Sequence, residues 1–253
     1  MLRKCVIALA LLAAALGGCS TRSISNSGYQ EDGYYGHNAF YQGEIDELDL
    51  FVPREREEPF GNDIRTALAD RRPVTAELGK PLLVVQSGAL VPDELMTDAL
   101  KDHFQVSPFS GVPSRPAYPY SNTASTAEPG SFGERLRLAA AQGGYERILV
   151  YWGQLEAQRS GGLTKAISWV PIVGAVVPDE SQDMRIRLKA AIIDVTTGRW
   201  HMILPESIAD SAISASINRA SSDQDQVQQL KAAGYAKLAD MIVAEASARA
   251  APN

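Results

Sequence analysis

One serine of the sequence is a candidate catalytic nucleophile. Ser87 follows an apolar run in the segment Val-Gln-Ser-Gly-Ala, at the kind of turn where an α/β-hydrolase carries G-x-S-x-G. Val85 replaces the first glycine of that motif. The alternative is a turn serine whose hydroxyl bonds nearby backbone groups, and the departure from the motif favours this alternative.

The other groups able to do chemistry are scattered along the sequence. The histidines His37, His103 and His201 show no metal-ligand spacing, and no phosphate-binding or dinucleotide-binding glycine motif is present. We therefore predict neither a metal nor another cofactor. Four carboxylates near strand ends are candidates for acid–base work, although solvated charges are the favoured interpretation. These are Glu156, Asp179, Glu180 and Asp194.

Three basic side chains share one face of a predicted strand. Over residues 184–195 apolar and basic residues alternate at first, which places Arg185, Arg187 and Lys189 on the wet face. Such a row can bind an anionic partner, for example a lipid headgroup, a glycan phosphate or an acidic protein. The favoured alternative is a solvated face whose charges pair with nearby acids.

The apolar run AISWVPIVGAVV at residues 166–177 is the most unusual stretch of the sequence. Pro171 interrupts a helix, and a membrane-spanning helix needs about 20 residues. The run either projects and contacts a membrane or a protein, or folds back over one end of the core, which is the favoured interpretation. In the first case the contact residues are Ile167, Trp169, Val170, Ile172 and Val173.

A mixed α/β fold must position these residues. The sequence predicts strands at 82–86, 104–107, 147–152 and 184–195, and the last returns through a glycine turn at 196–198 as a long antiparallel hairpin. It predicts helices at 92–103, from 131 to 143 behind an S-x-x-E capping box, and at 225–250, where a long amphipathic stripe is present. We expect a mixed sheet of about four or five strands packed by helices.

The amino-terminal residues form an export pattern. Arg3 and Lys4 precede an 11-residue apolar run, which small residues and a cysteine follow. The segment Leu16-Gly17-Gly18-Cys19 resembles the lipobox of bacterial lipoproteins. That resemblance implies that the Cys19 thiol carries a diacylglyceryl group and that Cys19 becomes the amino terminus. Ser20, in the place where Asp retains such proteins in the inner membrane, implies the outer membrane.

Charge is distributed unevenly along the chain. Residues 31–63 hold ten acidic side chains and two arginines, whereas residues 64–253 hold 20 acidic and 19 basic side chains. We predict three parts, which are a signal peptide at 1–18, a flexible acidic tether at 19–61 and a single periplasmic domain at 62–253. The segment 44–52 within the tether is predicted as a short docking helix or strand. A pI near 5.2 argues against nucleic-acid binding.

The predicted domain resembles a group of envelope lipoproteins with a small α/β periplasmic domain. The resemblance rests on the strands at 82–86 and 148–152 and on the hairpin sequence from Asp194 to Trp200. The group includes the TolB amino-terminal, curli-secretion and penicillin-binding-protein-activator lipoproteins. Members generally bind proteins or assemble into rings without catalytic residues, which implies the same here.

The sequence thus predicts a non-catalytic accessory or protein-interaction module, held on the periplasmic face of the outer membrane by acylated Cys19. Its expected partner is an envelope protein or a second copy of the chain. The alternative is an envelope hydrolase, such as a peptidase, whose site is assembled from scattered polar residues. A cleft in which a nucleophile or paired carboxylates meet a base would favour the hydrolase.

Overall fold

The computed structural model describes residues 19–26, 41, 43–52, 61–69, 73–113, 130–161, 180–213 and 219–250. The strands are β1 (Cys19–Ser23), β2 (Pro81–Gln86), β3 (Gln105–Phe109), β4 (Arg147–Gly161), β5 (Glu180–Asp194), β6 (Trp200–Ile203) and β7 (Ile208–Ile213). The helices are the 3-10 turn η1 (Ile24–Asn26), α2 (Glu47–Phe51), α3 (Gly61–Ala69), α4 (Glu94–Leu100), α5 (Phe132–Gln142) and α6 (Arg219–Ala250). The described residues thus form a mixed α/β fold.

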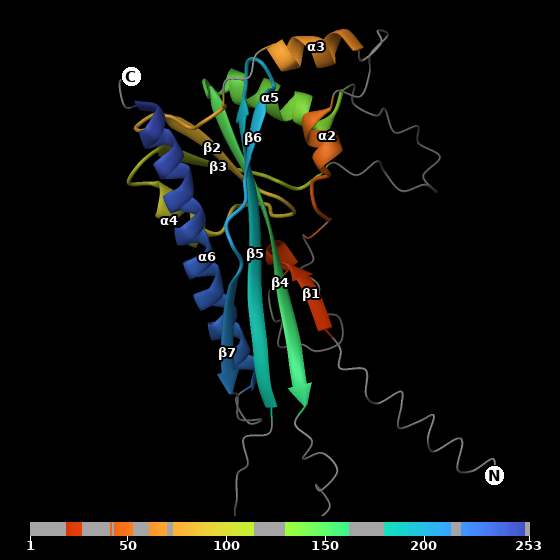
Figure 1. The fold of residues 1–253 in the computed structure, drawn as a ribbon, viewed down its shortest axis with the longest axis vertical. Coiled ribbons are helices and arrows are strands. Elements are labelled where there is room, and N and C mark those ends of the chain that lie inside the picture. The colour runs from red at the N-terminus through yellow and green to blue at the C-terminus, as the bar shows by residue number, and fades with distance from the viewer. Residues whose placement is uncertain are drawn as a thin grey trace, which may run out of the picture.

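A long antiparallel ladder of β4 and β5 is the axis of the sheet (Figure 1). The strand order is β3-β2-β4-β5-β6, with β2 parallel to both β3 and β4. β1 pairs with β4 and β7 pairs with β5. These two strands use the part of the ladder that β2 and β6 leave unpaired. β2 pairs with β4 at 148–151 and β1 pairs with it at 154–158, so the sheet has two levels along one ladder.

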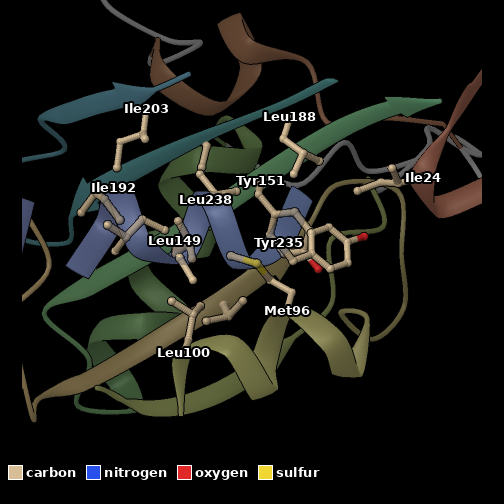
Figure 2. Close-up of a cluster of buried hydrophobic side chains, with 14 of the residues drawn as sticks. Ile24, Met96, Leu100, Leu149, Tyr151, Leu188, Ile192, Ile203, Tyr235 and Leu238 are labelled. Atoms are coloured by element: carbon tan, nitrogen blue, oxygen red, sulfur yellow. The ribbon is translucent and has the colours of Figure 1, made fainter. Parts of the chain in front are cut away.

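Two hydrophobic cores lie on opposite faces of the sheet. The first contains Leu149, Tyr151 and Ile192 from the ladder, together with side chains of α4 and α6 (Figure 2). The second contains Ile148, Val150 and Ile193, with α5 and α2 above them. Because successive strand residues point to opposite faces, the continuous apolar run at 148–152 supplies both cores at once.

Local signals in the sequence predicted several elements well. β2, β3, β4 and β5 include or overlap the four predicted strands, and the Ser131 capping box at α5 is formed as predicted. The turn after β5 has Gly198 at a φ of 72°, a left-handed conformation that glycine adopts without strain. The 92–103 helix is shorter than predicted, because Asp93 is its N-cap and residues 101–103 form a turn.

The predicted strand count was wrong, because the described residues form seven strands. β1 and β7 were missed: both are short and rich in small or polar residues, and they are strands because the exposed edges of β4 and β5 supply hydrogen bonds. The long antiparallel pairing is also elsewhere than predicted. It joins β4 to β5, whereas β5 and β6 pair over four residues only.

Part of the predicted tether belongs to the cores. Ile24 of η1 lies in the first core, and Ile45 and Leu50 lie in the second. The 44–52 segment does form a docking helix, α2, which Asp46 caps. The acidic composition suggested a solvated segment, but Ile24, Ile45 and Leu50 within it are buried, whereas Leu48 is exposed. The domain boundaries at 18/19 and 61/62 stay predictions.

Candidate functional site

An open pocket of about 790 Å³ lies between residues 41–48 and the outer face of the β4–β5 ladder. Its floor is formed by Trp152, Gly153, Gln154 and residues 187–189. β1 and the β6–β7 connection border it, through residues 21–23 and 204–207. Its lining mixes apolar side chains with side chains of both charges.

Ser87 fixes one wall of this pocket. Its hydroxyl accepts a hydrogen bond from the Ile45 amide at 2.7 Å, and the Trp152 indole donates to the Ile45 carbonyl at 3.0 Å. Both backbone groups of Ile45 are therefore satisfied by the domain. Ser87 is fully buried, and its described contacts are structural, as the turn-serine alternative expected. Its hydroxyl holds the segment 43–46 in place.

The basic row on β5 lies beside this pocket and is paired with acids. Glu156 forms salt bridges with Arg185 and with Arg187, the latter at 2.7 Å. Lys189 pairs with Glu47, and its ammonium lies 5.0 Å from the centroid of the Trp152 ring. Burial lowers the pKa of Lys189, and the negative charge of Glu44 opposes this. Anion binding by the row stays a prediction.

A buried polar network occupies the opposite face of the sheet. The Asp93 carboxylate accepts from Tyr235 at 2.5 Å and from the Lys231 ammonium at 2.9 Å. Gln86 accepts from the Tyr151 hydroxyl at 2.6 Å and donates to Ser25 at 3.0 Å. Burial, and next the Asp93 charge, raises the pKa of Tyr151 well above its usual value, and burial with the neighbouring Tyr151 and Asp93 does the same for Tyr235.

This network holds the segment after β1. Lys231, only 6% exposed, donates to the Ile24 carbonyl at 3.0 Å, and Ser25 donates to the Ser87 carbonyl at 2.6 Å. Gly153 makes room for Ile24, because a Cβ at this position would lie 2.7 Å from the Ile24 side chain. Sequence reasoning missed Lys231. The available signal was its position four residues after Val227, on the apolar stripe of α6.

A second close approach fixes α2. A Cβ at Gly133, on α5, would lie 1.8 Å from the Leu50 carbonyl oxygen, so only glycine lets α2 pack at this distance. Leu50 therefore enters the second core, close under α5. Ile24 and Leu50, both from the predicted tether, thus each pack closely against a glycine of the domain.

Within the described part of the chain, the remaining chemical candidates lie apart. His201 lies 3.3 Å from Glu245, and Asp194 forms a salt bridge with Arg147 at 2.8 Å. Burial alone would raise the pKa of Asp194, but hydrogen bonds from Thr197 and the charge of Arg147 lower it overall. Among the residues that the structure describes, no three His, Cys, Asp or Glu side chains are grouped as metal ligands.

Several predicted residues cannot be compared with the structure. Asp179 and the apolar contact candidates at 167–173 lie outside the described residues, as do His37 and the signal peptide. Cys19 is the first residue of β1, and Glu180 is the first of β5. Within the described ranges, no helix is long and apolar enough to cross a membrane.

Comparison with known proteins gives one informative match. A family model described as YafT bacterial lipoprotein matches residues 46–245. No curated protein matches the chain. The solved structure of the hypothetical protein CT253 from Chlamydia trachomatis is similar at 13% identity, covering 69% of this chain and 96% of that one, with a TM-score of 0.22. A TM-score this low supports no argument about this chain.

Proposed function

Because the chain belongs to the YafT bacterial lipoprotein family, and so is a lipoprotein of the cell envelope, we propose that Cys19 anchors it to the periplasmic face of the outer membrane. The lipobox from Leu16 to Cys19 supports acylation, and Ser20 supports the outer membrane. Each acyl chain contributes about 0.8 kcal/mol per buried methylene, so two or more chains, palmitate among them, anchor the protein stably.

Labelling and fractionation test the anchor. Cells grown with an alkyne analogue of palmitate should label the wild-type protein, and the label should sediment with outer membranes. Cys19→Ala should lose the label and the processing. Ser20→Asp is the matched control, since it keeps the thiol and should move the labelled protein to the inner membrane. Label retained in Cys19→Ala would contradict the proposal.

We further propose that the domain is a non-catalytic module that binds an envelope protein in the pocket between residues 41–48 and the ladder. The observation behind this is the pocket's apolar rim: Leu48 is 72% exposed and Leu204 is 64% exposed, although both line it. Side chains of this size at the mouth of a mixed-charge groove suit a peptide segment of a partner. The resemblance to the TolB, curli-secretion and activator lipoproteins, whose members bind proteins, points the same way.

Photocrosslinking in cells tests the pocket. A benzophenone amino acid at Leu204 should capture a discrete partner, and the same residue at Leu138 is the control because Leu138 is 61% exposed but lies on α5. Capture of a second copy of the chain would replace the heterologous partner with a homo-oligomer. Identical adducts from both positions would contradict binding in the pocket.

The predicted contact residues in the apolar run stay a separate proposal. Deleting residues 166–177 should remove a partner's adducts if Ile167, Trp169, Val170, Ile172 and Val173 carry the contact. An unchanged set of adducts would show that a partner does not need them.

A further inference from the structure

The lipid-bearing residue is itself part of the sheet. Cys19 is the first residue of β1 and pairs with Gln158 of β4, which in turn pairs with Asp183 of β5. After processing, no residue would separate the acylated amino terminus from the strand. The sequence predicted a tether from this residue onward, and the structure has a paired strand at residues 19–23.

β1 cannot dissociate from the domain without breaking buried contacts of the residues that follow it. Ile24, directly after β1, is 2% exposed in the first core, and its carbonyl accepts the hydrogen bond of Lys231. Ser25 donates to the Ser87 carbonyl and accepts from Gln86. Because these partners are buried and bonded, releasing β1 would leave several polar groups unsatisfied. The anchor is thus connected rigidly to the ladder.

The ladder continues beyond the anchor. β1 is antiparallel to β4, so the residues of β4 after Gln158 extend in the direction from which the chain arrives, which is the membrane side. β4 ends at Gly161, paired with Glu180, three residues past the level of Cys19. At about 3.4 Å per residue this is about 10 Å. The headgroup layer of one leaflet is comparable, at about 5–8 Å.

We propose that the end of the β4–β5 ladder lies in the headgroup layer of the membrane, and that the domain contacts the membrane directly, with no flexible spacer between them. We call this end the membrane end and define it as residues 158–161 and 180–183, together with Cys19. In Figure 1 it is the lower end of the ladder, opposite α3 and α5. The inference rests on the proposed acylation of Cys19.

Two arginines lie just beyond the membrane end, on its side away from the bilayer and within a side chain's reach of the headgroups. Arg185 pairs across the ladder with Glu156, two residues from the level of Cys19, and Arg22 pairs with Leu155. Both are exposed, and Glu156 forms salt bridges with Arg185 and Arg187. Guanidinium groups bind phosphates through paired hydrogen bonds. This suits a phospholipid surface, and the basic row would contact it at its lower end.

A fluorophore on a single introduced cysteine reports directly how deep that residue lies in the membrane. Cys19 is the mature chain's sole cysteine and is blocked by acylation, so one introduced cysteine carries an environment-sensitive fluorophore without background. The labelled variants are Ser160→Cys and Ser181→Cys, which pair with each other at the membrane end, and Thr196→Cys in the turn at the other end of β5. Thr196 is about 50 Å away along the strand and is the matched control.

Full-length acylated protein is reconstituted in vesicles of phosphatidylethanolamine and phosphatidylglycerol, and quenching by iodide and by brominated lipid is compared. At Ser160 and Ser181 we expect loss of iodide quenching and a gain of quenching by brominated lipid, whereas Thr196 keeps iodide quenching. Iodide should reach these sites less because the negative headgroups repel it and the hydrocarbon below excludes an unpaired ion. Equal melting temperatures of the three labelled proteins confirm that each is folded.

Two other results would overturn the inference in distinguishable ways. If all three labels are equally open to iodide while the protein floats with vesicles, anchoring holds and the membrane end does not rest in lipid. If the mass of the protein lacks the acyl groups and it does not float, the proposed anchor itself fails.

Discussion

The upper and lower halves of the β4–β5 ladder are built from the same two strands and differ in almost everything else. In the upper half, residues 148–152 are all buried, because α4 and α6 cover one face while α5 and α2 cover the other. In the lower half, Leu155, Ile186 and Leu188 belong to the first core only. Their outward neighbours are charged or polar and are partly or fully exposed.

β4 is therefore a fully buried strand in its upper part and a strand with one exposed face in its lower part. The sequence changes from a continuous apolar run to alternation at Trp152, whose register partner is Lys189. Above that pair the strand is interior, and below it the outer face is available to the pocket and, we propose, to the membrane. The predicted tether follows the same division, since its strand β1 pairs with the lower half and its helix α2 packs beside the upper half.

The largest difference in unfolding free energy should come from placing asparagine on the outer face of β4, once in the upper half and once in the lower half. Val150 and Gln154 share the outer face of β4, but Val150 is fully buried and Gln154 is exposed. Val150→Asn should lower the free energy of unfolding by about 3 kcal/mol or more, because it leaves a cavity and an unsatisfied amide. Gln154→Asn should change it by less than about 0.5 kcal/mol. Urea denaturation measures both, and equal losses would erase the distinction between the halves.

Removing the buried acid Asp93 and the exposed-face acid Glu156 should give the next largest difference in unfolding free energy. Asp93→Ala leaves the buried Lys231 ammonium with only the Ile24 carbonyl, so we expect a loss of about 3 kcal/mol. Asp93→Asn is the matched control, because its amide oxygen still accepts a hydrogen bond, and it should lose less. Glu156→Ala, in the lower half, should lose at most about 1 kcal/mol. A larger loss in Glu156→Ala than in Asp93→Ala would reverse the comparison.

Alkaline pH should act on the upper half through Tyr151 and through its neighbour Tyr235 of α6. Tyr151 and Tyr235 have raised pKa values, so their contribution is complete below the ordinary tyrosine pKa of about 10 and is lost as pH rises beyond it. Each such group gives a slope of at most about 1.4 kcal/mol per pH unit. Tyr235→Phe should flatten the alkaline fall in unfolding free energy. An unchanged slope would show that the tyrosine does not carry it.

Acid should weaken the lower half through Glu156. Burial would raise the pKa of Glu156, but hydrogen bonds and charge from Arg185 and Arg187 lower it overall. Its contribution is therefore present above the ordinary glutamate pKa, about 4.3, and is lost as pH falls through the lowered value. Denaturation of Glu156→Gln between neutral and acidic pH should show a shallower fall than the wild type.

The smallest effects should locate the boundary between the halves. Lys189 contacts Glu47 and the Trp152 ring, whereas Arg187, two residues lower, contacts Glu156. Lys189→Gln should cost up to about 1 kcal/mol because both contacts are lost. Arg187→Gln should cost less than about 0.5 kcal/mol. Thermal denaturation of the two variants side by side is the measurement, and a larger shift for Arg187→Gln would move the boundary downward.

Much of the scaffold was predictable from sequence because its signals are local. The capping box at Ser131, the turn at Gly198 and the apolar run of β4 act over a few residues, so they can be recognised without knowing the fold. The candidate site was less predictable. Ser87 was singled out, but its real partner, the Ile45 amide, lies 42 residues earlier in the chain.

The sequence by itself determined the lipobox pattern, the principal strands and the amphipathic α6, since each depends on neighbouring residues or on a short period. The tertiary structure was needed to show that β1 and β7 complete the sheet and that Ile24, Ile45 and Leu50 of the predicted tether enter the cores. The physical reason is distance along the chain. Lys231 and Ile24 are 207 residues apart, and their hydrogen bond exists only because the sheet brings α6 and η1 together.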